Sequence, residues 1–379
     1  MRAIKGGFYL KTLSQQEAED MLYGACIYGT GGGGNLEEGL QIINKLYTSG
    51  KRIQLVPLDE AQDEWLIASP YYVGSAAPPK KELMDKLNKL PAINENVSVL
   101  AARALEQSFG RKLDAVIATE LGANIAWAME TAAELGIPLI DADPAGRAVP
   151  DIAHTTFNIF DISIAPFALA NRYGDVLIIQ SVANHDRAEA IARSFAISSG
   201  NLAGMCDHPV TGRQLKQSVV PRTLSKSEAA GKAMRTAYEK GESPAELVCK
   251  AGNGKLMIKG RITSAEWKDV IGFIEGDVHI ESFDGEDRIS LWFRNEHMTV
   301  KRNNELIAII PELISVLDLK TGKPILNPAC EAGMEVAVLT FPAPKVWESE
   351  KGLAIFGPEY IGLKTDTYQN LKQPRNLII

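Results

Sequence analysis

At 379 residues the chain is long enough for two domains, because a single hydrophobic core stops growing near about 250 to 300 residues. Hydrophobic residues make up 45% of the chain and charged residues 23%, which is ordinary for a globular protein and excludes a mainly disordered one. The formal net charge of -7 provides no general attraction for nucleic acid or for an anionic membrane surface, so we expect neither as a partner.

The cysteines and the lack of long apolar segments indicate the compartment. The 4 cysteines are widely spaced and form no Cys-x-x-Cys pair, which argues against a disulfide framework. No stretch approaches the roughly 18 apolar residues of a membrane span, and the N-terminus lacks the apolar core of a signal peptide. We therefore expect a cytoplasmic protein that handles small molecules.

The first part of the chain alternates helical and strand patterns. Ser14 and Glu17 predict a capped helix start, and this helix should run to about residue 27. A glycine-rich segment follows, and then a helix over 36–46. Further strands are predicted at 52–57, 64–69, 113–120 and 137–143, and further helices at 80–90, 97–109 and 123–135. This alternation predicts an N-terminal α/β domain with a mostly parallel sheet over residues 1–170.

The second part of the chain is richer in strands. A strand at 176–182, a helix at 187–199, a strand at 202–208 and a helix at 225–239 come first. Period-two patterns then predict strands at 255–263, 269–282, 288–300, 306–317 and 335–339. We therefore expect a C-terminal β-rich domain with a few helices over residues 171–379, packed against the first domain across a cleft.

The glycine loop, residues 29–35, is the strongest local signal. Consecutive glycines would weaken a helix or strand, but they let backbone N–H groups approach a ligand. The loop fits neither a dinucleotide fingerprint nor a phosphate loop ending in Gly-Lys-Ser/Thr, so no nucleotide is expected. A tight turn or linker is the alternative. The binding candidates here are Gly31, Gly32, Gly33, Gly34 and Asn35.

Polar residues gather just beyond three predicted strands, where open α/β sheets bind ligands. They are Tyr72 after 64–69, Glu120 and Asn124 after 113–120, and Asp141, Asp143 and Arg147 around the end of 137–143. Asp141 and Asp143 are two apart and should point to one face of a strand. Carboxylates held close together share a proton or a cation, which suits acid/base chemistry. Helix capping by Asp143 and an ion pair made by Arg147 are the structural alternatives.

The segment 206–208 offers a second group of reactive side chains. On a strand Cys206 and His208 project to the same face, as a thiolate–imidazole pair or a metal site requires. A buried cysteine beside a packed histidine is the alternative. A divalent cation such as Zn²⁺ is an open option, although no metal-ligand spacing occurs. The candidate ligands are Asp141, Asp143, His154, His185, Cys206 and His208.

Several motifs in fixed order resemble one known family. They are YGTGGGG at 28–34, ELGAN at 120–124 and DADPAGRAVP at 141–150, followed by IIPELI at 309–314, PAP at 342–344 and GP at 357–358. Together they are similar to the S-methyl thiohydantoin desulfurase family over nearly the whole chain. The resemblance implies an N-terminal α/β domain, a C-terminal β-rich domain, and hydrolysis of an S-methylated thiohydantoin to a hydantoin and methanethiol.

The implied reaction assigns roles to the candidate residues. Glu120 or Asp143 would deprotonate the attacking water, Asp141 would bind the ring N–H, and Arg147 would bind an acidic side arm. The loop amides and Asn124 would hold the ring carbonyl. A covalent route through Cys206, assisted by His208, is the rival mechanism.

We therefore expect a hydrolase that cleaves a C–S or C–N bond of a five-membered ring, and two other functions are compatible with the same sequence. The first is a non-catalytic partner or subunit of a hydantoinase/oxoprolinase-type complex, since the family travels with such enzymes. The second is a binding module for a small metabolite. In each case we expect a small heterocyclic ligand and a homo-oligomer.

Overall fold

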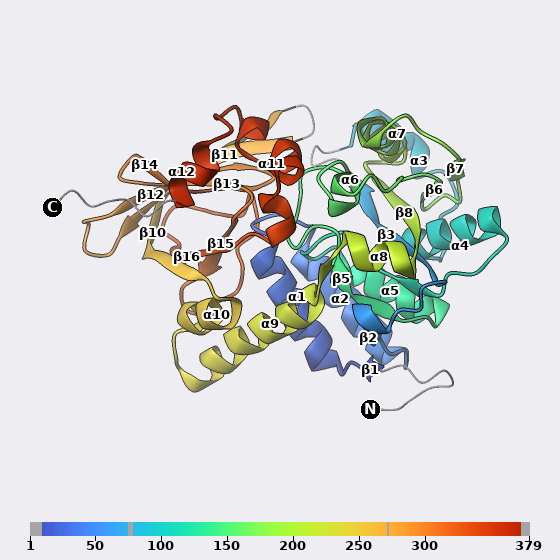
Figure 1. Ribbon diagram of the computed structural model, residues 1–379, viewed down its shortest axis with the longest axis horizontal. Coiled ribbons are helices and arrows are strands. Elements are labelled where there is room, and N and C mark those ends of the chain that lie inside the picture. The colour runs from blue at the N-terminus through green and yellow to red at the C-terminus, as the bar shows by residue number, and fades with distance from the viewer. Residues whose placement is uncertain (1–9, 75–78, 271–272, 373–379) are drawn as a thin grey trace.

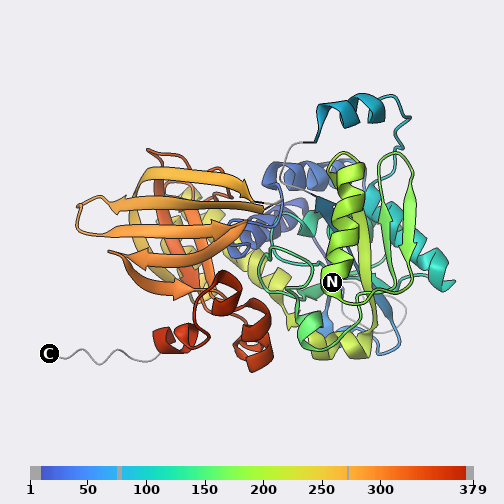
Figure 2. The same cartoon turned by 90° about the horizontal axis from the view of Figure 1, so that it is seen from above.

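The computed structural model describes residues 10–74, 79–270 and 273–372, which form two sheet-centred halves (Figure 1). In Figure 2 the two halves lie side by side, with the C-terminal sheet on one side and the α/β half on the other. This mixed α/β architecture confirms the predicted fold class. No helix within these ranges is long and apolar enough to cross a membrane.

The N-terminal sheet is parallel at its centre. Strands β2, β5, β4 and β3 are neighbours and run parallel, while β1, β8 and β9 pair antiparallel with this centre, and β6 and β7 extend it beyond β8. The strands are β1 Lys11–Thr12, β2 Gln54–Pro57, β3 Leu66–Gly74, β4 Ala115–Val116, β5 Leu139–Asp143, β6 Phe167–Ala170, β7 Val176–Ile179, β8 Leu202–Thr211 and β9 Val220–Pro221.

Helices cover both faces of this sheet. Apolar side chains of α1, α2, α4 and α5 form one buried cluster with the central strands, and alanines of α7 pack against β3, β6 and β8 in another. The helices are α1 Gln15–Tyr28, α2 Leu36–Thr48, η1 Leu58–Glu60, α3 Lys81–Leu87, α4 Val97–Phe109, α5 Ile125–Leu135, α6 Thr156–Ile159, α7 His185–Ser198 and α8 Gly212–Ser218. Helix α1 begins with the predicted capping box of Ser14 and Glu17.

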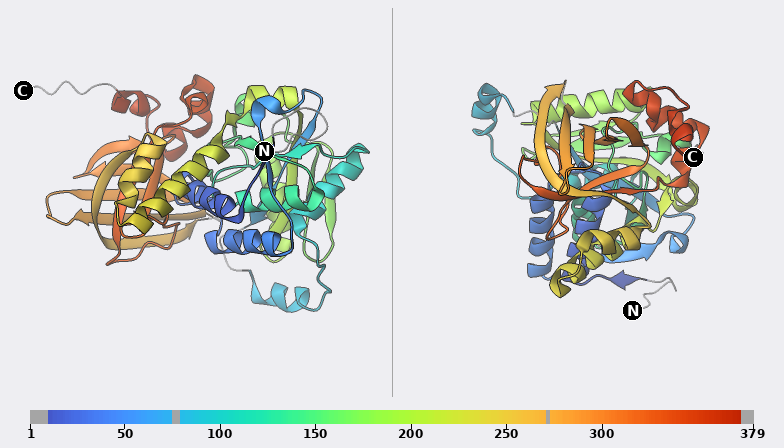
Figure 3. Two further views of the ribbon diagram at one scale, coloured as in Figure 1. Left: turned by 90° about the horizontal axis from the view of Figure 1, so that it is seen from below. Right: turned by 90° about the vertical axis from the view of Figure 1, so that its left-hand side faces the viewer.

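The C-terminal sheet is antiparallel, in the order β14-β13-β12-β11-β10-β16-β15. Its alternating buried residues form a separate core cluster. The strands are β10 Lys255–Val270, β11 Phe273–Ser282, β12 Arg288–Arg294, β13 Glu296–Arg302, β14 Glu305–Ile309, β15 Leu313–Asp318 and β16 Glu335–Phe341. The curvature of this sheet is visible in the right-hand view of Figure 3.

Two groups of helices join the halves. Helix α9 (Thr223–Lys240) lies along α1, as Figure 3 shows from below, and Arg235 of α9 makes two 2.8 Å hydrogen bonds to Asp20 of α1. Helix α10 (Pro244–Gly252) leads into β10. The C-terminal segments η2 Lys345–Glu348, α11 Glu350–Phe356, η3 Pro358–Ile361 and α12 Thr367–Lys372 pack around buried Trp347 and Phe356.

Several details differ from the sequence-based prediction. The boundary predicted at residue 170 falls inside the first sheet, because β7 and β8 follow it and pair with β6. The strand predicted at 288–300 is two strands, β12 and β13, separated by Asn295 with a positive φ of 57°. The strand predicted at 306–317 is likewise interrupted between β14 and β15.

Candidate functional site

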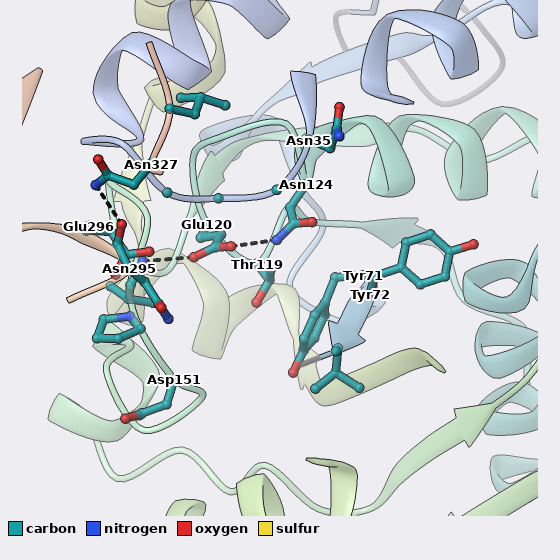
Figure 4. A pocket seen from close by; sticks show the side chains of 18 of the residues that line it. Asn35, Tyr71, Tyr72, Thr119, Glu120, Asn124, Asp151, Asn295, Glu296 and Asn327 are labelled. Atoms are coloured by element: carbon teal, nitrogen blue, oxygen red, sulfur yellow. Dashed lines mark hydrogen bonds between the residues drawn. The ribbon is translucent and has the colours of Figure 1, made fainter. Parts of the chain in front are cut away.

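A cavity of about 670 Å³ lies where the two halves meet, which is a size typical of small-molecule sites. The N-terminal half contributes the glycine loop, Glu120, Asn124 and Tyr72 to its lining, and the C-terminal half contributes Glu296 with its neighbours. Figure 4 shows Glu120 at the centre of this group, between Asn124 and Glu296. The cavity therefore exists only when both halves are in place.

The glycine loop forms one wall of the cavity, and its carbonyl groups are used internally. The Gly33 carbonyl accepts the Asn124 N–H at 2.7 Å, and the Gly31 carbonyl accepts the Asn327 N–H at 2.8 Å. The amides of Gly33 and Gly34 have no partner within the described parts of the chain. They precede Asn35, whose side chain caps α2. The loop therefore offers N–H groups to a ligand oxygen.

Glycine is required at two loop positions because other parts of the site approach the backbone closely. A Cβ added to Gly32 would lie 2.0 Å from Glu296 Oε1, and one added to Gly33 would lie 2.7 Å from the Gly122 Cα. Gly33 also has a positive φ of 81°. The glycine run therefore admits the carboxyl group of the other half as well as exposing amides.

Glu120 is the central acid of the cavity. It lies after the short strand β4, where its Oε1 accepts from Asn124 Nδ2 at 2.7 Å and its Oε2 accepts from the Val149 N–H at 2.9 Å. Burial raises the pKa of Glu120 to about 7, and these two hydrogen bonds oppose the rise. A carboxyl group with this pKa exchanges a proton readily near neutral pH.

Glu296 is a second buried acid, which the sequence analysis did not single out. It begins β13 directly after Asn295, whose conformation turns the chain toward the glycine loop, and the adjacent His297 N–H donates to the Thr30 carbonyl at 2.7 Å. Burial and then the nearby Glu120 raise the pKa of Glu296 well above its usual range. Its Oε2 has no partner among the described residues. Glu296 therefore holds its proton more tightly than an ordinary glutamic acid.

Arg147 does not line the cavity, contrary to the prediction that it binds a substrate anion. Its side chain is fully buried and donates to the carbonyls of Pro311 and Glu312 at 3.0 and 3.1 Å and to Thr30 Oγ1 at 3.1 Å. The guanidinium also stacks over Phe356. Arg147 thus fastens the two halves together behind the site, because its planar fork matches several acceptors at once.

Asp141 and Asp143 point to one face of β5, yet neither lines the cavity. Asp141 accepts from the N–H and the hydroxyl of Ser225 at the start of α9. Asp143 accepts from the N–H groups of Ala145 and Gly146 at 2.7 and 2.6 Å. Asp141 thus holds the start of α9 and Asp143 holds a turn, so the helix capping that was the alternative for Asp143 is made by Asp141 instead.

The expected pairing of Cys206 with His208 is wrong because β8 is irregular at this point. His208 has a positive φ of 43°, and the β3–β8 register shifts beside it. Cys206 lies in the core cluster beneath α4 and α5, whereas His208 stacks on Phe157 and contacts His185 of α7. Burial and the nearby Asp207 also raise the pKa of the Cys206 thiol well above its usual range, so it is no thiolate nucleophile.

The candidate metal ligands are not assembled. His154 Nδ1 lies 2.9 Å from Asp151 Oδ1, and its ring packs against Phe356 and Tyr360. Within residues 10–74, 79–270 and 273–372, no group of three or more His, Cys, Asp or Glu side chains is placed to hold a metal ion. The donor set therefore does not fit a divalent cation, and we derive no step through one.

Other polar residues of the lining were not foreseen from the sequence. They are Glu37, Glu38, Tyr71, Thr119, Asp151, Thr155, Glu189, Arg193, Asn295 and Asn327. Arg193 is the only Lys or Arg among the described lining residues, and it makes an ion pair with Glu189. The Asn-Glu sequence at 295–296 was the available signal for the second acid, since asparagine readily adopts a positive φ and interrupts a strand.

Comparisons with known proteins agree with this architecture. Residues 16–181 match the family model described as S-Me-THD-like, N-terminal domain, and residues 183–371 match S-Me-THD-like, C-terminal domain. A protein from Chromobacterium violaceum, solved by X-ray crystallography, superimposes with a TM-score of 0.76 at 24% identity, covering 93% of this chain and 96% of its own. A search of the curated proteins finds no match. The structural match shows a shared fold.

Proposed function

The chain belongs to the S-Me-THD-like family, the S-methyl thiohydantoin desulfurase family, and on that basis we propose that it is a hydrolase of small hydantoin-like rings. The specific reaction proposed is cleavage of an S-methyl thiohydantoin to a hydantoin and methanethiol. One observation carries the proposal, namely two buried carboxyl groups from different halves that face one cavity beside free loop amides. A scaffold protein has no need for this costly arrangement.

The two acids take complementary roles because their pKa values differ. Glu120, as carboxylate, removes a proton from the water that attacks C2 of the ring. Glu296, as carboxylic acid, protonates the ring nitrogen double-bonded to C2, which makes that carbon electrophilic. When the tetrahedral intermediate collapses, its hydroxyl proton returns to Glu296 and the C–S bond breaks. Methanethiolate takes one proton that comes from solvent, and Glu120 returns to solvent the proton it took from the attacking water. The products are a C2 carbonyl, a ring N–H and methanethiol.

The remaining cavity residues bind and orient the ring. The amides of Gly33 and Gly34 bind the ring carbonyl oxygen, and Asn124 holds Glu120 in place while its own backbone is fixed by Gly33. Tyr72, which meets Trp127 edge to face, forms an apolar wall for the flat ring. Arg193 replaces Arg147 as the group for an acidic side arm.

A thiol-release assay tests this proposal. Purified protein is incubated with S-methyl thiohydantoins that differ in their side arm, thiol is measured with a disulfide reagent, and the ring product is identified by mass spectrometry. We expect equimolar methanethiol and hydantoin. Hydantoins without the methylthio group serve as controls for ring opening. Absence of thiol release from the whole series would contradict the proposal and favour the non-catalytic partner of a hydantoinase-type complex.

A further inference from the structure

Four polar side chains form an unbroken hydrogen-bonded row that leaves the cavity on the α7 side. Tyr71 Oη donates to Asp207 Oδ2 at 2.6 Å. Asp207 Oδ1 lies 2.9 Å from His208 Nδ1, and His208 Nε2 lies 3.2 Å from His185 Nε2. The proposed acid and base, Glu120 and Glu296, make none of these contacts.

The row connects the cavity with the protein surface. Tyr71 lines the cavity. Burial and Asp207 raise the pKa of Tyr71 most, and Glu120 makes a smaller contribution in the same direction because it lies nearby. Asp207 and His208 are buried, at 1% and 2% exposure. His185 is the first residue of α7 and only partly buried. A proton entering at His185 therefore has a continuous path to the cavity.

The relay requires one set of hydrogen-bond directions. Tyr71 donates to one Asp207 oxygen, and His208 donates from Nδ1 to the other. His208 Nε2 accepts from His185 Nε2–H. Tyr71 and His208 already give each oxygen of the buried Asp207 carboxylate a hydrogen-bond partner, so the contact between His208 and His185 is not needed to satisfy Asp207. A proton path gives this last link a purpose.

We propose that Tyr71 is the proton donor to the departing sulfur and that Asp207, His208 and His185 reload it from solvent. This inference rests on the proposed function, because it supplies the proton that methanethiolate needs. It separates the acid for the leaving group from Glu296, which serves the ring nitrogen. The row thus has a task that the two glutamates leave open.

The transfer balances as follows. The sulfur takes the Tyr71 Oη proton as the C–S bond breaks, and the phenolate takes the proton that Asp207 has received on Oδ1 and brings to it by rotation of its carboxyl group. Asp207 is supplied by His208 Nδ1–H, His208 Nε2 by His185 Nε2–H, and His185 Nδ1 by water. Rotation of the two imidazole rings restores their starting tautomers. Glu120 releases to solvent the proton it took from the attacking water, so one proton enters and one leaves per turnover.

The charge states of the two ends suit a relay that stores no charge. Burial and Asp207 hold the pKa of Tyr71 well above its usual range, so it keeps its proton between turnovers. Burial and the neighbouring His208 lower the pKa of His185 to about 4, so it is neutral at pH 7. Protons then pass by exchange along the hydrogen bonds.

Chemical rescue tests the relay. His185→Ala removes the point where protons enter the row but keeps the donor Tyr71. We therefore expect kcat for thiol release to fall about ten-fold, less than the loss from removing an acid, with KM unchanged. Added imidazole should restore the rate. Tyr71→Phe should lose about 100-fold or more and show no rescue. His279→Ala is the matched control, because His279 is an exposed residue of β11, and this variant should behave as wild type.

Nitrogen NMR of the two histidines gives a readout that needs no turnover. We expect His208 protonated at Nδ1 and His185 at Nε2 at neutral pH, with both signals altered by Asp207→Asn. Full activity of His185→Ala without any imidazole effect would overturn the relay, and so would His208 protonated at Nε2. Failure of the wild-type protein to release thiol would instead count against the proposed reaction, while the spectra would still decide whether the path exists.

Discussion

Replacing Glu120 by Gln should remove turnover and stabilise the protein at the same time. The side chain keeps its size, and its amide oxygen can accept from the Val149 N–H while Asn124 turns its own oxygen toward the new N–H2 group. It can no longer take a proton from water. Loss of a positioned general base costs about 10²- to 10⁴-fold in kcat. In the wild-type protein, kcat/KM should rise with pH and level off above about 7, because the base acts when it is deprotonated.

The stability gain follows from the same pKa. Burial raises the folded-state pKa of Glu120 from 4.5 to about 7, so the folded state binds this proton more tightly than the unfolded state. The stability this group contributes is therefore fully present below pH 4.5 and is lost as pH rises through about 7, a change of about 3 kcal/mol. Gln resembles the protonated acid, so the variant should match wild type near pH 4.5 and exceed it by about 3 kcal/mol at pH 8.

Urea unfolding between pH 4.5 and 8 and thiol release by the same preparations would measure both effects. Asp143→Asn is the matched control, because burial raises the pKa of Asp143 to about 6 and yet it lies outside the cavity. That variant should gain stability at pH 8 and keep its turnover. The reasoning about Glu120 fails if the glutamine variant keeps more than a tenth of wild-type kcat, or if its stability difference does not change with pH.

Four further substitutions separate the roles assigned to the site. Gly32→Ala should lower kcat about 100-fold, because the added methyl group displaces Glu296, and should lower the free energy of unfolding in urea by about 1–3 kcal/mol. Unchanged kinetics would refute the close approach of Glu296 to Gly32. Glu296→Gln should lower kcat by about 100-fold at unchanged KM, as steady-state assays would show. Arg147→Lys should lower the free energy of unfolding by about 3 kcal/mol or more. A raised KM at unchanged stability would instead support the predicted role of Arg147 in substrate binding. Ser225→Ala should cost about 1 kcal/mol and leave turnover intact, since Asp141 only holds the start of α9.

The sequence predicts the local features of this protein well. The Ser14–Glu17 capping box and the glycine loop between two helices are visible because each depends on neighbouring residues. Glu120 and Asn124 follow from the rule that polar residues beyond parallel strands face the ligand side of the sheet, and both line the cavity. The two-domain division into α/β and antiparallel parts follows from the change in hydrophobic period.

Long-range contacts account for what the sequence did not reveal. Glu296 was hidden within a strand predicted at 288–300, because only the positive φ at Asn295 turns it toward the glycine loop. Asp141 has the same strand-end signature as Glu120, but its partner Ser225 is 84 positions away. Arg147 is adjacent to the site in sequence, yet its acceptors Pro311 and Glu312 belong to the other half.

Glu120, Glu296 and Arg147 are best understood as one electrostatic unit. Arg147 stays a cation at neutral pH, although burial lowers its pKa to about 10, and the charges of Glu120 and Glu296 favour that cation. One buried positive charge favours one negative charge beside it, which suits a pair of carboxyl groups that holds a single proton. Catalysis requires this condition, because one carboxyl must accept a proton while the other donates one. The guanidinium that fastens the two halves therefore also sets the proton count of the acids between them.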